Sequence, residues 1–303
     1  MIPTSLLLVS LLSLPFAKDA QQGVPAPAKP HQKASASPKN PAEVLEITLA
    51  QLRDLQADDG SWGGRPETTA LALLAFSGDG NTVHSGPHKE GLRGGLTWLL
   101  GQSQENGDLG AGNPKAHVLA TAYLAECFNF GKSPRIKQAL SSALEHLAHI
   151  KVASAPDLLI WAGLAAATAR EAKVRIPESL KTQLDESLSK RPKMADALPG
   201  VYLAKARWFE EGPAAEWSKG LEELPLSDSI SVEEIALRLH AHFQVSDESF
   251  FPRYRQLLPR VWLQIQAILA VDQDASPGQM ETLAFAALCL ETPWRLARVG
   301  EED

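Results

Sequence analysis

Between two apolar helical patterns, the chain reads Gln56-Ala57-Asp58-Asp59-Gly60-Ser61-Trp62-Gly63-Gly64. A weaker copy between two further apolar patterns reads Gln102-Ser103-Gln104-Glu105-Asn106-Gly107-Asp108-Leu109-Gly110. A unit of helix, glycine-rich turn and helix that recurs along a chain is typical of repeat architectures. The two turns therefore predict a fold built from helical hairpins.

The two helices that flank each turn differ in their apolar pattern. The first, as in 44–55 and 92–100, carries one apolar stripe, whereas the second, as in 69–76 and 117–125, is apolar almost all round. A helix that is apolar all round is buried, and a striped helix covers it from outside. Four weaker pairs follow, over 136–148 with 158–165, 180–188 with 201–209, 217–224 with 235–243, and 257–269 with 282–290. No segment sustains a period of two, so strands are not expected.

Six outer–inner pairs of about 40 residues either stack as an open solenoid or close into a ring. An open solenoid needs polar capping helices, and the last pair here is as apolar as the first. We therefore predict an all-α fold in the form of an α/α toroid of about six helical hairpins.

Several residues of the two turns are expected to have structural roles. Gly60 and Gly63 allow the backbone to turn sharply, and Asp58 or Asp59 accepts N–H bonds of the turn. Trp62 is predicted to fill the gap between neighbouring hairpins, and Gln56 to bind exposed carbonyls at the end of the outer helix. The corresponding residues of the second turn are Gln102 and Gly107.

The N-terminal region divides into two segments that precede the folded domain. The apolar run over 6–14 has the length of a signal-peptide core, so residues 1–17 are predicted to be a signal peptide. Residues 18–41 are rich in proline, alanine and lysine and are predicted to be a disordered linker. The toroid is then predicted to cover 42–303, and the protein is expected to be exported to the periplasm or cell surface. An uncleaved anchor or a mistranslated start is the alternative.

The charge of the chain excludes two classes of binding partner. The formal net charge of −7 argues against nucleic acid, and the folded region has no basic block suited to a membrane surface. No transmembrane domain is expected after removal of the signal.

The two cysteines are not expected to form a disulfide. Cys127 and Cys289 lie in apolar helical segments and are expected to be buried. In the predicted ring they are too far apart to be bridged.

The first turn, through Gln56, Gly60 and Trp62, resembles the repeat of the prenyltransferase and squalene-cyclase family, whose fold is an α/α toroid. In the second turn, Gln102 or Gln104 with Gly107 matches the repeat, with Leu109 in the tryptophan position. The resemblance is specific over 45–131 and extends diffusely over 132–303.

The resemblance does not carry over an active site. Family cyclases use an Asp-x-Asp-Asp motif, and Asp272-Gln273-Asp274-Ala275 lacks the final acid. Protein prenyltransferases of this fold bind zinc through Asp, Cys and His, but neither cysteine here has such residues at a suggestive spacing. The Cys-Gly-Glu-Gln thioester of complement-like members is missing as well. The chain thus resembles a degenerate member of the family, and no catalytic residue, cofactor or metal site is predicted.

In a toroid, the starts of the inner helices surround the central funnel. The candidate ligand-binding residues at these positions are Glu67, His117, Asp157, Tyr202, Glu233 and Glu281, with Thr68 and Lys115 beside them. Helix capping and the helix dipole also favour acids there, and this is the simpler explanation. The functional alternative is a rim that binds a polar ligand or supplies a carboxylate pair that acts on a glycan.

The pair His84 and His88 is not expected to form a metal site. His84 and His88 form a His-x-x-x-His pattern, but Gly86 and Pro87 interrupt any helix there and no third ligand is evident. A solvated loop is therefore expected at this position.

The sequence as a whole predicts an exported, non-catalytic binding or scaffold module whose ligand is a protein segment, a lipid or a glycan held in the central cavity. The alternative is an enzyme of the terpenoid-cyclase-like or polysaccharide-degrading type that uses the rim acids. An open funnel with converging acids favours the enzyme, whereas a filled cavity with acids serving as helix caps favours the scaffold.

Overall fold

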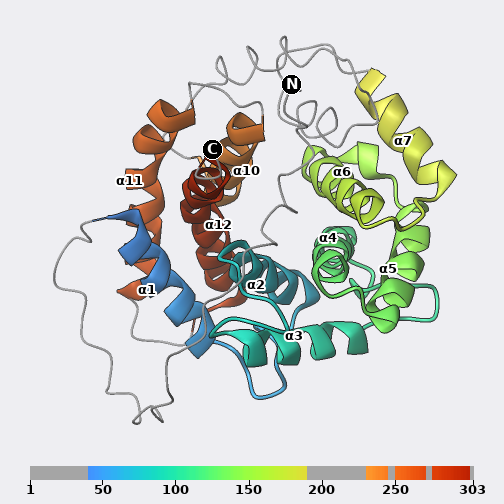
Figure 1. The fold of residues 1–303 in the computed structure, drawn as a ribbon, viewed down its shortest axis with the longest axis horizontal. Coiled ribbons are helices and arrows are strands. Elements are labelled where there is room, and N and C mark those ends of the chain that lie inside the picture. The colour runs from blue at the N-terminus through green and yellow to red at the C-terminus, as the bar shows by residue number, and fades with distance from the viewer. Residues whose placement is uncertain (1–39, 190–229, 245–249, 271–274, 301–303) are drawn as a thin grey trace.

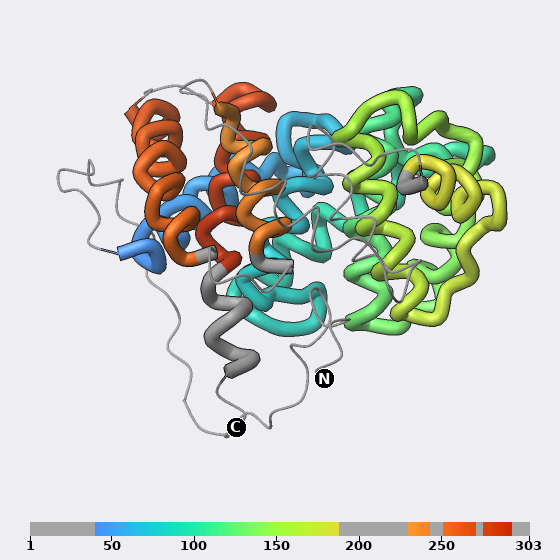
Figure 2. The backbone as a smooth tube through the Cα atoms, turned by 90° about the horizontal axis from the view of Figure 1, so that it is seen from above, coloured from blue at the N-terminus to red at the C-terminus, as the bar shows by residue number. Residues whose placement is uncertain are grey.

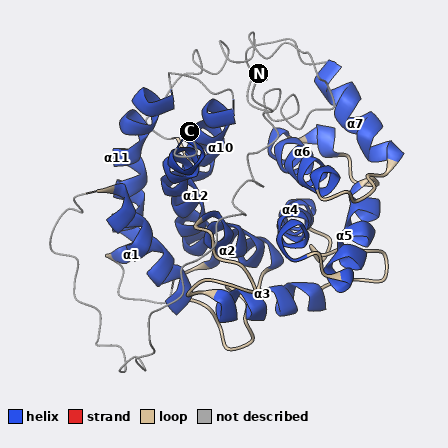
Figure 3. Ribbon diagram, in the orientation of Figure 1, coloured by secondary structure: helices blue, strands red, loops and turns tan. Residues whose placement is uncertain are grey.

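The computed structural model describes residues 40–189, 230–244, 250–270 and 275–300. Of these residues 74% are helical, and no strand occurs among them (Figure 3), which confirms the all-α class. The predicted signal peptide, nearly all of the predicted linker, the predicted helices over 201–209 and 217–224, and the rim candidate Tyr202 lie outside the described residues.

The described ranges contain ten α-helices and one short 3₁₀ turn. They are α1 (Pro41–Asp54), α2 (Pro66–Gly78), α3 (Lys89–Gly101), α4 (Pro114–Gly131), α5 (Pro134–Leu147), η1 (Val152–Ser154), α6 (Pro156–Glu171), α7 (Glu178–Ser189), α10 (Val232–Gln244), α11 (Phe250–Leu269) and α12 (Pro277–Gly300). Each predicted helix in the described ranges overlaps one of these elements, and α4, α11 and α12 extend well beyond the predicted ranges.

Prolines mark the start of six helices, α1, α2, α4, α5, α6 and α12. Proline suits the first helical position because its fixed φ is helical and its missing N–H would have no partner there. Asparagines cap two of these helices: the Asn40 side chain accepts from Glu43 N, and the Asn113 side chain accepts from Lys115 N and Ala116 N. The first helix therefore begins at Pro41, inside the last residues of the range expected to be linker.

The helices form two layers of an arc (Figure 1). The inner layer consists of α2, α4, α6, α10 and α12, and the outer layer of α1, α3, α5, α7 and α11. Every residue of α2 from Glu67 to Gly78 is buried, whereas α1 buries only the stripe from Val44 to Leu52. The difference predicted between striped outer helices and fully apolar inner helices is therefore present in the structure.

The first and last hairpins meet. Among the inner helices, α2 packs against both α4 and α12, α4 continues to α6, and α12 continues to α10. The outer helix α1 also packs against α12. Seen from above, α10, α11 and α12 lie at one end of the arc, α4 to α7 lie at the other, and α2 lies between them (Figure 2). Helices α7 and α10 precede and follow residues 190–229 in the sequence, and these residues are outside the described part of the chain.

One hydrophobic core runs through the described helices, from Val44 in α1 to Leu290 in α12. Cys127 and Cys289 are both buried free thiols within it. Burial raises the pKa of the Cys127 thiol to about 12, so it remains protonated at neutral pH. Within the described residues, no helix combines the length and the apolar character needed to cross a membrane.

Candidate functional site

The first turn connects the first hairpin to the next outer helix, α3, through hydrogen bonds and close packing. Gln56 Nε2 donates to Gly60 O at 2.8 Å and to Gly91 O, in α3, at 2.9 Å. Gly60 has a φ of +90°, and a Cβ added there would lie 2.6 Å from the carbonyl of Gly94 in α3. Only glycine therefore permits both the turn and this close approach.

Trp62 packs beside Gly95 of α3, as expected of a residue between hairpins, and also takes the role predicted for Gln56. Trp62, which is 1% exposed, donates from Nε1 to Leu52 O at 2.7 Å and so binds a carbonyl at the end of α1. That role was expected of Gln56, which instead binds the turn and α3. Asp59 Oδ1 accepts from the N–H of Ser61 at 2.9 Å, in agreement with the expected turn bond. Gly63, with a φ of +62°, faces Pro277 at the start of α12.

The second turn repeats the backbone pattern with different side chains. Gln104 N donates to Asp108 O and Gly107 N to Gln104 O, as Ala57 N does to Ser61 O and Gly60 N to Ala57 O in the first turn. A Cβ on Gly107 would lie 2.3 Å from Ser142 O in α5. In this register Ser103 replaces the glutamine of the first turn, and Gln102 only donates to Trp98 O of its own helix at 3.4 Å. The expectation that Gln102 repeats the role of Gln56 is therefore wrong.

The starts of the inner helices gather into a cluster of ion pairs and hydrogen bonds, which we call the rim. It consists of Arg65, Glu67, Thr68, Asn113, Lys115, Glu233 and Glu281. Three predicted candidates, Glu67, Glu233 and Glu281, are thereby brought together from α2, α10 and α12. Asp157, at the start of α6, is half-buried and close enough for its charge to act on Lys115.

Lys115 lies at the centre of the rim. Its Nζ is 2.8 Å from Glu233 Oε1 and 3.7 Å from Glu67 Oε1. Burial lowers the pKa of Lys115, but the hydrogen bond and negative charge of Glu233, with the charges of Glu67 and Asp157, outweigh it, so the net shift is upward. The ammonium is thus held in its charged form between two carboxylates.

The third acid of the rim, Glu281, has its own partners. Its Oε1 accepts from Thr68 Oγ1 at 2.8 Å and lies 3.8 Å from Arg65 Nη1. Arg65 also contacts Glu67 at 3.4 Å, and Asn113 Nδ2 donates to Glu67 at 3.3 Å. These contacts join residues near the starts of α2, α4 and α12.

A small cavity lies deeper between the inner helices. It has a volume of about 60 Å³ and receives side chains from all five inner helices. Its lining residues are Leu74, Ala122, Glu126, Trp161, Leu164, Thr168, Ala236, Leu237, His240, Phe285, Leu288 and Thr292. Leu74 lies about 10 Å beyond Glu67 along α2, at the helical rise per residue. The cavity is therefore separate from the rim and far smaller than the roughly 150 Å³ that accommodate benzene in an apolar core.

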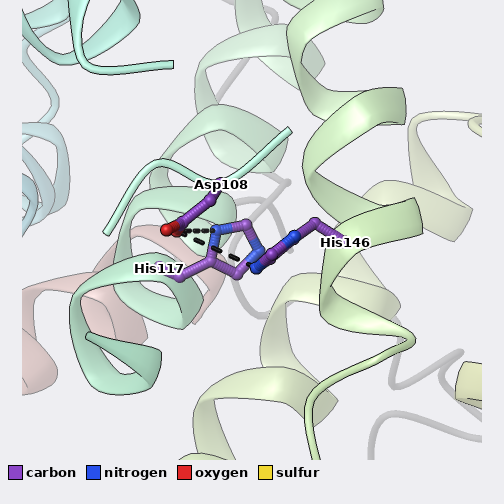
Figure 4. Close-up of side chains that lie close together, drawn as sticks. All are labelled: Asp108, His117 and His146. Atoms are coloured by element: carbon purple, nitrogen blue, oxygen red, sulfur yellow. Dashed lines mark ion pairs between the residues drawn. The ribbon is translucent and has the colours of Figure 1, made fainter. Parts of the chain in front are cut away.

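His117 does not belong to the rim. It is fully buried, its Nδ1 accepts from Leu109 N at 3.1 Å, and its Nε2 faces Ala143 O in α5 at 3.0 Å. Burial lowers the pKa of His117 to about 4, so the ring is neutral at physiological pH. The prediction of His117 as a rim residue is wrong because its ring turns outward, between α4 and α5, toward Asp108 and His146 (Figure 4).

Two rim residues, Arg65 and Asn113, are absent from the sequence-based candidates. Both directly precede a helix-starting proline, Pro66 or Pro114. Their position at the N-terminus of an inner helix is the signal in the sequence that marks them, and the acidic candidates share it.

Comparisons with protein-family models, with curated proteins and with solved structures gave no match for this chain.

Proposed function

We propose that this chain is an exported, non-catalytic binding or scaffold module, built as a degenerate toroid-type repeat protein, and that its rim contacts the ligand. The observation that carries the proposal is the position of Lys115 Nζ between the carboxylates of Glu67 and Glu233. A glycosidase needs the space between its two carboxylates for the scissile bond and a water molecule. Here an ammonium group fills that space.

The small cavity supports the same interpretation. An isoprenoid cyclase needs an apolar pocket that encloses most of its substrate. About 60 Å³ is room for a few water molecules, not for an isoprenoid or a lipid chain. The ligand in this proposal therefore lies on the rim, outside the cavity that the sequence suggested for it, and a protein segment or a glycan fits better than a lipid.

The chemistry of the rim suits such a polar ligand. Arg65, at 48% side-chain exposure, and Glu281, at 20%, are accessible and offer both signs of charge. Because these groups are already held by neighbours, binding immobilises few further side chains and its entropic cost is reduced.

The test is a binding screen with the purified chain on glycan and peptide arrays, followed by calorimetry on each ligand found. We expect Glu281→Gln to weaken binding at least about tenfold, because it removes a rim charge. Glu90→Gln, on the exposed face of α3, is the matched control and should leave affinity unchanged. Turnover of an isoprenoid diphosphate or a polysaccharide that Glu233→Gln abolishes would refute the proposal and establish the enzyme alternative.

A further inference from the structure

Asp108, His117 and His146 converge between the second turn, α4 and α5 (Figure 4). One potential ligand atom from each residue lies within 4.8 Å of the other two. His117 Nδ1 is 3.4 Å from Asp108 Oδ1, and His146 Nε2 is 4.0 Å from the same oxygen. Asp108 and His117 are buried, while His146 retains 22% side-chain exposure and so leaves the cluster accessible from one side.

The hydrogen bonds of His117 define its tautomer, and its one lone pair accepts from Leu109 N beside Asp108. His117 Nε2 faces the carbonyl of Ala143, which can only accept, so Nε2 carries the proton and Nδ1 the lone pair. A metal-binding histidine is held in the same way, with its second ring nitrogen donating to a carbonyl or carboxylate.

Asp108 is fixed by the backbone of its own turn. Oδ1 accepts from Gly110 N and Oδ2 accepts from Gly112 N, each at 2.7 Å. Carboxylates that bind metals are similarly oriented by hydrogen bonds to their oxygens. Two acceptor atoms, Nδ1 of His117 and Oδ1 of Asp108, therefore lie 3.4 Å apart, and a cation that displaces the Leu109 N–H from Nδ1 would contact both.

The distances suit a tetrahedral ion. Ligands with bonds of 2.0–2.1 Å to zinc are about 3.3 Å apart in tetrahedral geometry. The separation of 3.4 Å between Asp108 and His117 matches this value. His146 lies 4.0 Å from Asp108 and within 4.8 Å of His117, so its partly exposed side chain would have to move closer to both residues.

We propose that Asp108, His117 and His146 form a binding site for one zinc ion, with water as the fourth ligand. Two imidazoles and a carboxylate are a ligand set that zinc accepts. The ion would connect the second turn and α4 to α5. It would take the Nδ1 lone pair to which Leu109 N now donates, so binding should shift the amide signal of Leu109.

The experiment is a titration of the chelator-treated full-length chain with zinc chloride by calorimetry, and with cobalt(II) by visible absorption. We expect one ion per chain and the absorption bands of tetrahedral cobalt. His146→Gln should weaken zinc binding by more than about tenfold, because loss of an indirect partner alone has an effect of that size. Since His146 is partly exposed, this variant tests the site even where Asp108→Asn or His117→Gln prevents folding.

Two control variants identify the site. His149→Gln changes an exposed histidine just beyond α5, and His84→Gln with His88→Gln removes the His-x-x-x-His pattern; both should bind zinc as the unmodified chain does. Absence of zinc and cobalt binding by the folded chain would overturn the proposal. So would binding that His146→Gln leaves unchanged, or binding that is lost in the His84 and His88 variant.

Discussion

At the second turn, the imidazole of His117 combines two bonds that different side chains make at the first turn. Thr69 Oγ1 accepts from Trp62 N, and His117 Nδ1 accepts from Leu109 N in the corresponding place. Gln56 bonds to a carbonyl of α3, and His117 Nε2 bonds to a carbonyl of α5. The second turn can therefore lack the glutamine of the first without losing its connection to the next outer helix.

The glycines of the second turn give a matched pair of substitutions. Gly107 and Gly112 both have a φ of +85°, but a Cβ would meet Ser142 O at 2.3 Å only at Gly107. We expect Gly112→Ala to destabilise the fold by about 1–2 kcal/mol through backbone strain alone. Gly107→Ala should cost about 2–5 kcal/mol, because overpacking against α5 adds to the strain. Urea unfolding of both variants measures the difference, and equal values would mean that α5 does not approach the turn this closely.

At the scale of single elements, the helices begin where proline and a capping residue coincide. The sequence shows two such start signals, Asn40 followed by Pro41 and Asn113 followed by Pro114. The helix ends are less well marked. Helix α6 ends on Glu171, an acid at the negative end of the helix dipole.

Glu171 should make the stability of the protein depend on pH. Burial raises its pKa from 4.5 to about 7, although the charge of Arg170 acts in the opposite direction. The folded state therefore holds a proton that the unfolded state releases, and stability falls as pH rises from about 4.5 to about 7. Glu171→Gln removes this effect, so the variant should gain stability over the unmodified chain across that range.

Urea unfolding at several pH values tests this expectation. Glu145→Gln, on the exposed side of α5, is the control. A difference between Glu171→Gln and the unmodified chain that stays constant from pH 4 to pH 8 would contradict the assigned shift.

At the scale of the whole molecule, the rim connects the first half of the sequence to the second. Lys115 in α4 contacts Glu233 in α10, and Thr68 in α2 contacts Glu281 in α12. Both pairs are far apart in sequence, and both lie at one end of the inner layer. The rim therefore fixes the relative position of α2, α4, α10 and α12 as well as offering a polar surface.

Removal of the central ammonium should destabilise this arrangement. Lys115→Met leaves Glu67, whose side chain is only 8% exposed, without one of its cationic neighbours. We expect a loss of about 1–3 kcal/mol in the free energy of unfolding. In the double variant with Glu233→Gln the loss should be smaller than the sum of the single losses, because the second change removes a charge that the first left uncompensated. Strict additivity in urea unfolding would show that the two groups do not interact.

The sequence by itself determined the class of the fold, the hairpin unit and the division into striped outer and apolar inner helices. These features follow from local periodicity and turn chemistry, which short stretches such as 56–64 encode completely. The meeting of Glu67, Glu233 and Glu281 required only that the inner helices start at the same end. The tertiary structure alone decided that Lys115 lies between two of these acids and that the cavity between the described inner helices measures only about 60 Å³. It alone also decided that His117 points away from the rim, toward Asp108 and His146. The contacts of Lys115, the size of the cavity and the direction of His117 all depend on how side chains from distant helices pack together.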